Sequence, residues 1–196
     1  MKKINSEKLL DKLGENYSPL SIECRQELIA RVNNLTLHKG EVVVREGQFS
    51  DKAYLIAEGC SRAYYLKDGK DISDWFAFEN EFMSSIVSFF CKEPSPHYIE
   101  FMEDSLVMEF SRDTIDHLCD QHHDFERLIS KVVTKTMLGL RERLSSILFN
   151  KAEERYAQLI HTRPDITNRM PLTHIASYLG ITLETLSRIR NPKNRI

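Results

Sequence analysis

The sequence predicts an α+β chain with an N-terminal antiparallel β-roll, a long central helix and a C-terminal helix-turn-helix. Three observations lead to this fold class. Short β-rich runs separated by turn residues fill much of the first half, and apolar residues at helical spacing follow them. Near the C-terminus the sequence has the residue spacing of a helix-turn-helix: a small residue, a glycine four positions later and then an apolar pair, at Ala176, Gly180, Leu186 and Ile189. We therefore expect a roll domain at residues 1–112, a helical region at residues 113–150 and the helix-turn-helix domain at residues 151–196.

Length and composition fit a globular protein. Of the 196 residues, 41% are hydrophobic and 29% are charged, which is enough apolar material for a packed core. No apolar run approaches the roughly 20 residues of a membrane helix, and the charged N-terminus lacks the apolar segment of a secretory signal. We therefore expect a cytoplasmic protein. Its four cysteines form no C-x-x-C pair, so we expect separate reduced thiols and no iron–sulfur cluster.

Charge is distributed unevenly along the chain. The net charge is −2, but the segment from Arg163 to the C-terminus carries six basic and two acidic residues, a net charge of +4, which leaves −6 for the remainder. An acidic body with a basic end is expected where only that end meets phosphate. The asymmetry supports nucleic-acid contact without establishing it.

Two short helices and then the strands of the roll are expected in the first half. Ser18-Pro19 divides the two helices, and Ser21 can cap the second. Asp68-Gly69 predicts a hairpin turn. Turn signals at intervals of about 8–12 residues are typical of an antiparallel barrel or roll. We expect strands at residues 42–44, 53–56, 62–66, 72–78, 98–102 and 106–110.

A long helix is expected over residues 124–150, where apolar residues recur at three- and four-residue steps. Such a helix is long for a small domain, and its apolar stripe needs a partner. The same helix of a second subunit is the simplest partner, although burial against the roll of the same chain would also cover it. We favour a homodimer, and we expect a further helix at residues 151–160.

The most specific signal lies in residues 172–191. Ala176 is small, so a second helix can cross closely over it, and Gly180 stands four residues later, where the chain must turn with positive φ. Thr182 is expected to cap a second helix whose Leu186 and Ile189 face the core. These offsets describe a helix-turn-helix.

The outward face of this second helix is polar and basic. Glu184 and Arg188 are four residues apart and project together. Arginine can bond guanine bidentately, and glutamate can accept from the cytosine amino group. A solvated helix with a Glu–Arg pair is the alternative, but such a pair contributes only about 0.3 kcal/mol. We expect DNA contacts from Thr173, Thr182, Glu184, Thr185, Ser187, Arg188, Arg190 and Lys193.

A family resemblance rests on two segments. Residues 175–189 read IASYLGITLETLSRI and closely resemble the helix-turn-helix of the Crp/Fnr family (cyclic-AMP receptor protein/fumarate–nitrate regulator). Residues 39–41, 46–47 and 54–59 read KGE, EG and YLIAEG and resemble the opening of that family's cyclic-nucleotide-binding-type domain. The resemblance implies a double-stranded β-helix roll and a winged helix-turn-helix. It further implies a bacterial transcription regulator that binds near-palindromic double-stranded DNA as a homodimer.

The roll departs from the members that bind cyclic AMP. In those members a glutamate takes the ribose hydroxyl and an arginine takes the cyclic phosphate. At the corresponding positions Ser84 replaces a glycine, Ser85 the glutamate and Ser95 the arginine. The resemblance therefore implies another effector than cyclic AMP, or none, and Leu183 in place of a second arginine leaves the operator sequence open. Residues of a tentative effector pocket are Phe82, Ser84, Ser85, Ser95 and His97.

Rival functions have weaker support in the sequence than DNA binding. The cluster of His117, Cys119, His122 and His123 could suggest zinc, but His117 and His122 are five residues apart and diverge on a helix, so we expect no metal. The sequence contains no catalytic motif, so we expect no enzyme and no cofactor. A small-molecule-binding module without its own DNA activity remains the alternative, although it would leave the outward Glu–Arg pair unexplained.

Overall fold

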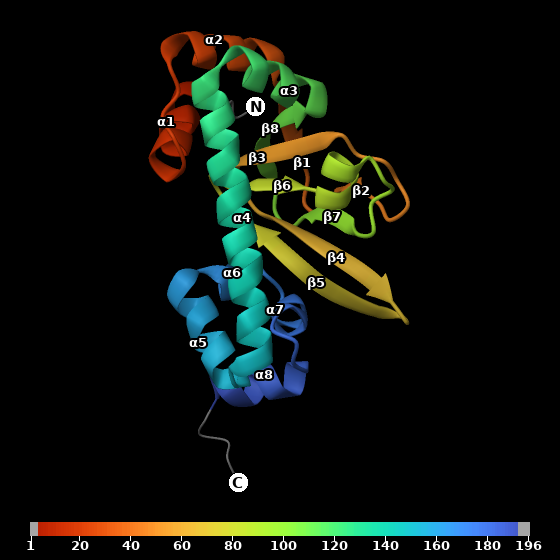
Figure 1. Cartoon of the computed structure of the whole chain (residues 1–196). Helices are drawn as coiled ribbons and strands as arrows, with labels where there is room; N and C mark the ends of the chain where they lie inside the picture. The colour runs from red at the N-terminus through yellow and green to blue at the C-terminus, as the bar shows by residue number, and fades with distance from the viewer. Residues whose placement is uncertain (1–3, 192–196) are drawn as a thin grey trace.

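The strands form two four-stranded antiparallel sheets that pack against each other as a roll (Figure 1). The structure is a computed structural model that describes residues 4–191. One sheet has the order β1-β8-β3-β6 and the other the order β2-β7-β4-β5. The strands are β1 (Asn33–Leu37), β2 (Val42–Val44), β3 (Lys52–Glu58), β4 (Ser61–Lys67), β5 (Lys70–Ala77), β6 (Phe82–Ser84), β7 (Tyr98–Phe101) and β8 (Ser105–Ser111).

Apolar side chains from both sheets fill the inside of the roll. Tyr54, Ile56 and Val107 of one sheet meet Ala63 and Ile99 of the other in one buried cluster. Each of these strands turns alternate side chains inward, so the β-rich runs of the sequence supply the lining. A π-helical turn, η1 (Val87–Cys91), connects β6 toward β7.

The β4–β5 hairpin contains the predicted Asp-Gly turn. Asp68 and Gly69 have φ of 52° and 73°, as a type I′ turn needs, and Lys67 pairs with Lys70 across it. All six expected strands are present. The sequence pattern does not predict β1 and β6, because both are short edge strands whose pairing with β8 and β3 fixes their conformation.

Helices cover the outer face of the first sheet. They are α1 (Ser6–Asn16), α2 (Ile22–Arg31), α3 (Arg112–Gln121) and the first turns of α4 (His123–Phe149). Leu28 of α2 and Phe125 of α4 pack with Met108 of β8 in one buried cluster. Ser21 caps α2 as expected, since its hydroxyl accepts from the N–H of Cys24 at 3.3 Å.

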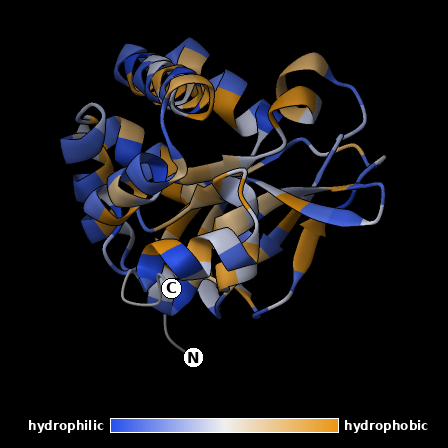
Figure 2. Ribbon diagram, turned by 90° about the horizontal axis from the view of Figure 1, so that it is seen from below, coloured by the Kyte–Doolittle hydropathy of each residue, from blue (hydrophilic) through white to orange (hydrophobic). Residues whose placement is uncertain are grey.

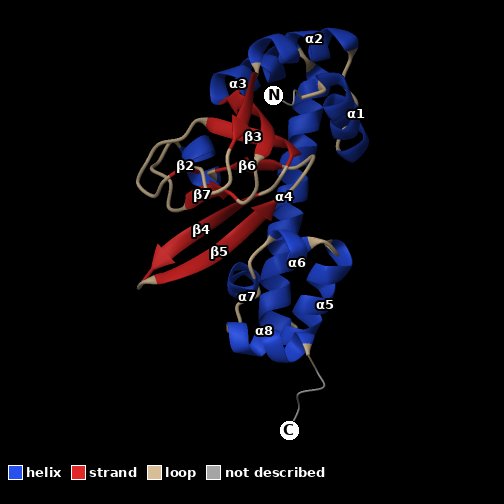
Figure 3. Cartoon of the chain, turned by 180° about the vertical axis from the view of Figure 1, so that it is seen from behind, coloured by secondary structure: helices blue, strands red, loops and turns tan. Residues whose placement is uncertain are grey.

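The helix α4 has 27 residues and is about 40 Å long at 1.5 Å per residue. It runs from the N-terminal helices past the roll to the C-terminal helices (Figure 3), so one rigid element connects all three regions. Its bounds lie one residue from those expected at each end. None of the helices in the described part of the chain combines the length and apolar character needed to span a bilayer.

The C-terminal part consists of α5 (Ala152–Thr162), α6 (Ile166–Arg169), α7 (Leu172–Tyr178) and α8 (Leu183–Arg190). Figure 2 shows hydrophilic and hydrophobic stretches alternating along the helices, as amphipathic helices around a core require. Between residues 151 and 191 the described chain contains no strand, so the wing implied by the resemblance is absent from these residues. The segment between α5 and α7 forms the short helix α6 instead. Ile166 and Met170, which are buried with Leu186, anchor this segment.

Candidate nucleic-acid interface

The turn between α7 and α8 has the geometry that the sequence predicts. Gly180 has a φ of 66°, and the N–H of Ile181 donates to the carbonyl of Ala176 at the end of α7. Thr182 then caps α8, because its Oγ1 accepts from the N–H of Thr185 at 3.2 Å. These contacts set the direction in which α8 leaves α7.

The inner faces of α7 and α8 are buried together. Ile175, Ala176, Leu179 and Leu186 are each at most 4% exposed and share one cluster. The methyl side chain of Ala176 lets the two helices approach closely. The expectation of a core-facing side chain is confirmed for Leu186, whereas Ile189 is half-buried.

The outer face of α8 is polar and open. Glu184 lies one turn before Arg188, whose Nη2 donates to Oγ1 of Thr185 at 3.3 Å. The backbone N–H of Glu184 and the hydroxyl of Thr182 lower the pKa of the Glu184 carboxyl, so it is charged near neutral pH. Of the residues expected to meet DNA, Thr173, Thr182, Glu184, Ser187, Arg188 and Arg190 are exposed, Thr185 is half-buried and Lys193 lies outside the described residues.

The helix-turn-helix is attached to the roll through α7 and β5. The N–H of Ser73 in β5 donates to Oγ of Ser177 in α7 at 3.0 Å, and that hydroxyl donates to the carbonyl of Asp71 at 3.0 Å. Phe76 of β5 also packs on the ring of Tyr178, with 4.9 Å between ring centroids. The β4–β5 hairpin therefore holds α7 by polar and apolar contacts together.

Arg62 of β4 is a buried cation at the same junction. It is 4% exposed and donates to Asp71 at 2.7 Å and to Glu100 at 2.9 Å. Its guanidinium lies 4.0 Å from the centroid of the Tyr64 ring and also contacts His174 of α7. A buried charge is costly unless it is paired and hydrogen-bonded, and these partners supply both.

Two arginines of the basic C-terminal segment face the roll. Arg169 donates to Glu79 at 2.7 Å and to Glu103 at 2.9 Å, and Arg163 pairs with Glu81. The interpretation of the whole C-terminal charge as phosphate-facing is therefore wrong for Arg163 and Arg169. Their charge supports the contact between the roll and the helix-turn-helix, where each has an acidic partner.

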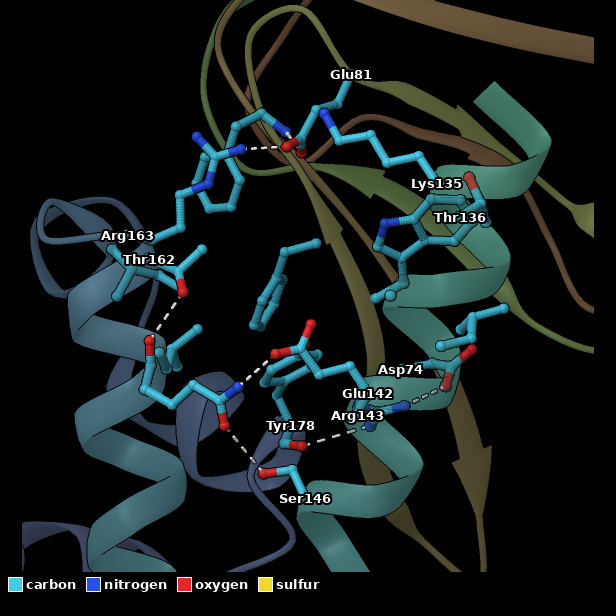
Figure 4. Close-up of a pocket in the computed structure, with 18 of the residues that line it drawn as sticks. Asp74, Glu81, Lys135, Thr136, Glu142, Arg143, Ser146, Thr162, Arg163 and Tyr178 are labelled. Carbon is cyan, nitrogen blue, oxygen red and sulfur yellow. Dashed lines mark hydrogen bonds and ion pairs between the residues drawn. The ribbon is translucent and has the colours of Figure 1, made fainter. Parts of the chain in front are cut away.

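A cavity of about 330 Å³ lies between β5, α4 and the C-terminal helices (Figure 4). Arg143 of α4 crosses one side of it, donating to Asp74 at 3.0 Å and to the carbonyl of Tyr178 at 3.4 Å. Trp75 and Phe78 add aromatic surface to its lining. The aromatic run at residues 75–78 and Phe82 could be recognised in the sequence as a possible apolar lining, with core packing as the favoured alternative. No sequence signal relates this run to the other walls, which come from segments that lie far apart in the chain.

Three of the tentative effector residues lie together inside the roll. The Ser85 hydroxyl donates to Oγ of Ser95 at 2.8 Å, and Ser95 donates to the carbonyl of His97 at 2.7 Å. His97 is 5% exposed, and neither ring nitrogen has a hydrogen-bond partner among the described residues. Its ring meets Tyr65 edge to face, with 5.5 Å between centroids. Burial lowers the pKa of His97, so the buried imidazole is neutral near pH 7.

The other two tentative effector residues lie elsewhere. Phe82 packs on Phe110 and Tyr17, with ring centroids 5.8 Å and 6.4 Å away, toward the N-terminal helices. Ser84 is half-buried in β6, where it pairs with Ala53 of β3. The five residues therefore do not line one common pocket.

The apolar stripe of α4 divides into two parts. Its beginning, at Phe125 and Leu128, is buried against the roll and the N-terminal helices of the same chain. Ile129 and Val132 are partly buried against the same cluster. Farther along the helix, apolar residues are 43–63% exposed in the single chain, at Val133, Met137, Leu140, Leu144 and Leu148. Steps of four and three residues are typical of a seam between two helices.

The comparisons with known proteins agree with this architecture. Residues 34–122 match the family model of the cyclic nucleotide-binding domain. The fumarate and nitrate reduction regulatory protein of Yersinia pestis is 23% identical over 166 residues, which are 78% of this chain and 65% of that protein. The transcriptional activator protein Anr of Pseudomonas protegens is 24% identical over 165 residues, 78% of this chain and 67% of that protein. These matches support the resemblance of the chain to the Crp/Fnr family.

A solved structure has the same fold as this chain. FixK2 from Bradyrhizobium japonicum superposes with a TM-score of 0.71 at 18% identity, covering 82% of this chain and 83% of that one. The predicted fold class, a β-roll joined by a long helix to a helix-turn-helix, is confirmed. The chain spans about two thirds of the length of the two curated relatives.

Proposed function

We propose that this chain is a sequence-specific DNA-binding transcription regulator that reads DNA with α8. The observation that carries the proposal is the division of α8 into a buried side at Leu186 and an open side with Glu184 and Arg188. On a helix in the major groove, arginine can bond guanine bidentately and glutamate can accept from cytosine. The regulators that the chain matches support this proposal. It assigns no catalytic role and no cofactor.

A homodimer would present two such helices to a near-palindromic operator. The uncovered stripe of α4 supports pairing with the α4 of a second copy, because four-three spacing keeps one seam facing a partner. Residues 1–112 would then serve as the sensor, residues 113–150 as the dimerising region and residues 151–196 as the DNA-binding domain. The two copies of α8 would address half-sites about 34 Å apart, or a multiple of that distance.

The roll would sense an effector other than cyclic AMP, or none. Ser85 and Ser95 stand where the resemblance places a glutamate and an arginine in members that bind cyclic AMP, and here their hydroxyls bond each other. His97 is the polar group beside them with unused hydrogen-bonding capacity. Its two ring nitrogens would supply the hydrogen bonds to an effector that enters this part of the roll.

Selection of bound sequences from a random DNA pool tests the proposal. The wild type should enrich a two-fold-symmetric motif, and Arg188→Ala should weaken binding to that motif by about 1–3 kcal/mol and relax preference at one position per half-site. Arg45→Ala, which removes an exposed arginine of the roll, is the matched control and should select the wild-type motif.

Two results would contradict direct readout by α8. One is a wild-type pool without a symmetric motif, which would favour a small-molecule-binding module without its own DNA activity. The other is an unchanged motif with Arg188→Ala, which would place base recognition on other residues.

A further inference from the structure

Three kinds of metal ligand meet where α2 passes the junction of α3 and α4, at the top of Figure 1. Cys24 of α2, His122 at the junction and Asp124 in the first turn of α4 bring a sulfur, an imidazole nitrogen and a carboxylate oxygen within 4.8 Å of one another. Cys24 lies far in the sequence from His122 and Asp124, and the regulator proposed above makes no use of the three residues.

A carboxylate lies behind the histidine. Glu27, one helical turn after Cys24, contacts Nε2 of His122 at 2.8 Å and Nε2 of His117 at 2.8 Å. Because Nε2 of His122 is engaged, Nδ1 is the nitrogen left for a metal. Histidines that bind metals usually donate their other ring N–H to a carboxylate in this way, which fixes the tautomer and the ring orientation.

The cluster is shielded from solvent and partly ordered in advance. Cys24 is fully buried, the side chain of His122 is 16% exposed and Asp124 is half-buried. The carboxylate of Asp124 accepts from the N–H of Ser21 at 2.6 Å and from the N–H of Phe125 at 2.9 Å. A buried thiol, an oriented imidazole and a held carboxylate therefore converge on one point, unlike a patch of surface acids.

We propose that Cys24, His122 and Asp124 bind a divalent transition metal of the zinc class, with Glu27 orienting His122 and water as the fourth ligand. Sulfur and imidazole ligands favour zinc-like ions over magnesium and calcium. Bond lengths of about 2.0–2.3 Å put tetrahedral ligand atoms roughly 3.5 Å apart, so side-chain shifts of about 1 Å would close the site. The thiol binds as thiolate and releases its proton to solvent.

The spacing of the histidines in the sequence argued against a metal here, because His117 and His122 diverge on a helix. The proposed site needs only His122 as a ligand, while His117 contacts Glu27 and the sulfur comes from α2. A bound metal would join α2 to the start of α4. We therefore expect binding to stabilise this end of the molecule.

Titration of the full chain with Co²⁺ tests the site, because cobalt occupies zinc sites and its thiolate bond absorbs light by charge transfer. The reduced, chelator-treated protein should develop this band up to one Co²⁺ per chain and lose it on addition of Zn²⁺. Cys24→Ser should abolish the band. Cys119→Ser, which changes a half-buried cysteine of α3 outside the ligand set, is the matched control and should keep it.

A second variant keeps the test decisive if Cys24→Ser does not fold, which circular dichroism would detect. Glu27→Gln leaves all three ligands in place and should weaken metal affinity by about 10–100-fold. The proposal is overturned if the wild type shows no thiolate band, if the band survives Cys24→Ser, if Cys119→Ser removes it, or if Glu27→Gln binds as tightly as the wild type. DNA binding is not a readout here, so the two proposals stand or fall separately.

Discussion

Nη1 of Arg62, in the roll, lies 3.0 Å from Nδ1 of His174, in the helix-turn-helix. Arginine stays protonated, so its N–H donates and Nδ1 is the acceptor, which requires a neutral imidazole. Asp71 and Glu100 hold the guanidinium in place. The charge of one imidazole therefore affects the contact between the roll and the helix-turn-helix directly.

Acidification is expected to loosen α7 from β5. Burial, and then the neighbouring Arg62, lower the pKa of His174 from its ordinary value of 6.5. A histidine with a lowered pKa stabilises the folded contact fully above its ordinary pKa, and the contribution is lost as the pH falls below 6.5. The amide of Ser73, which donates to Ser177, should lose exchange protection between about pH 7.5 and about pH 5.

His174→Asn separates this contact from other titrations, because asparagine can accept a hydrogen bond but carries no charge at any of these pH values. The variant should remove most of the pH dependence at the Ser73 amide. Burial also lowers the pKa of His97, so some global pH dependence should persist. An unchanged pH profile at Ser73 in His174→Asn would contradict the assignment.

Gly59→Ala is expected to destabilise the roll strongly. Gly59 has a φ of 96°, and an added Cβ would lie 2.7 Å from Cβ and 3.0 Å from Cα of Ser105. Left-handed strain of about 1–2 kcal/mol and crowding of about 1–3 kcal/mol should together lower the free energy of unfolding. Gly40→Ala is the control, since Gly40 has a φ of 82° and open space around it. If urea denaturation gives the same loss in the free energy of unfolding for Gly59→Ala and Gly40→Ala, crowding against Ser105 contributes nothing.

Met137→Glu combined with Leu144→Glu should convert a dimer to a monomer. Both side chains are 59% exposed on the uncovered stripe of α4, so a two-fold seam would bury four carboxylates without partners. Light scattering measures the mass directly. Lys131→Glu introduces a carboxylate on the opposite side of the same helix and should leave the dimer intact. A wild-type monomer at micromolar concentration would refute the proposed assembly.

Cyclic AMP is not expected to bind tightly. Hydrogen bonds to charged groups contribute about 1.5–3 kcal/mol each, so the loss of a glutamate and an arginine should weaken binding by roughly two to four orders of magnitude. The Ser85 and Ser95 hydroxyls are also engaged with each other, and Ser85 is fully buried. Calorimetry that gives a micromolar dissociation constant for cyclic AMP would overturn this prediction.

Sequence patterns were sufficient for elements whose own residues determine them. Gly180 and Thr182 place the turn and the start of α8, and Asp68-Gly69 places the β4–β5 hairpin, because backbone conformation and capping are local effects. The edge strands β1 and β6 were missed because their pairing partners, rather than their own residues, hold them extended.

The outward face of α8 was also predictable, since helical period alone separates Leu186 from Arg188. The junction with the roll was not. Arg62 and His174 are 112 residues apart, and no periodicity or motif relates two positions that only folding brings together. For the same reason, the sequence does not indicate that Cys24 lies close to the histidine at the start of α4.

Arg163 and Arg169, which pair with carboxylates of the roll, also affect how strongly DNA affinity should depend on salt concentration. Each phosphate neutralised by a basic side chain releases condensed counterions, and the logarithm of the binding constant falls with the logarithm of salt concentration by about 0.9 per contact. Arg163 and Arg169 pair with carboxylates of the roll, which leaves Arg188 and Arg190 as the exposed arginines of that segment among the described residues. Binding should therefore weaken less steeply with added salt than the charge of the C-terminal segment suggests.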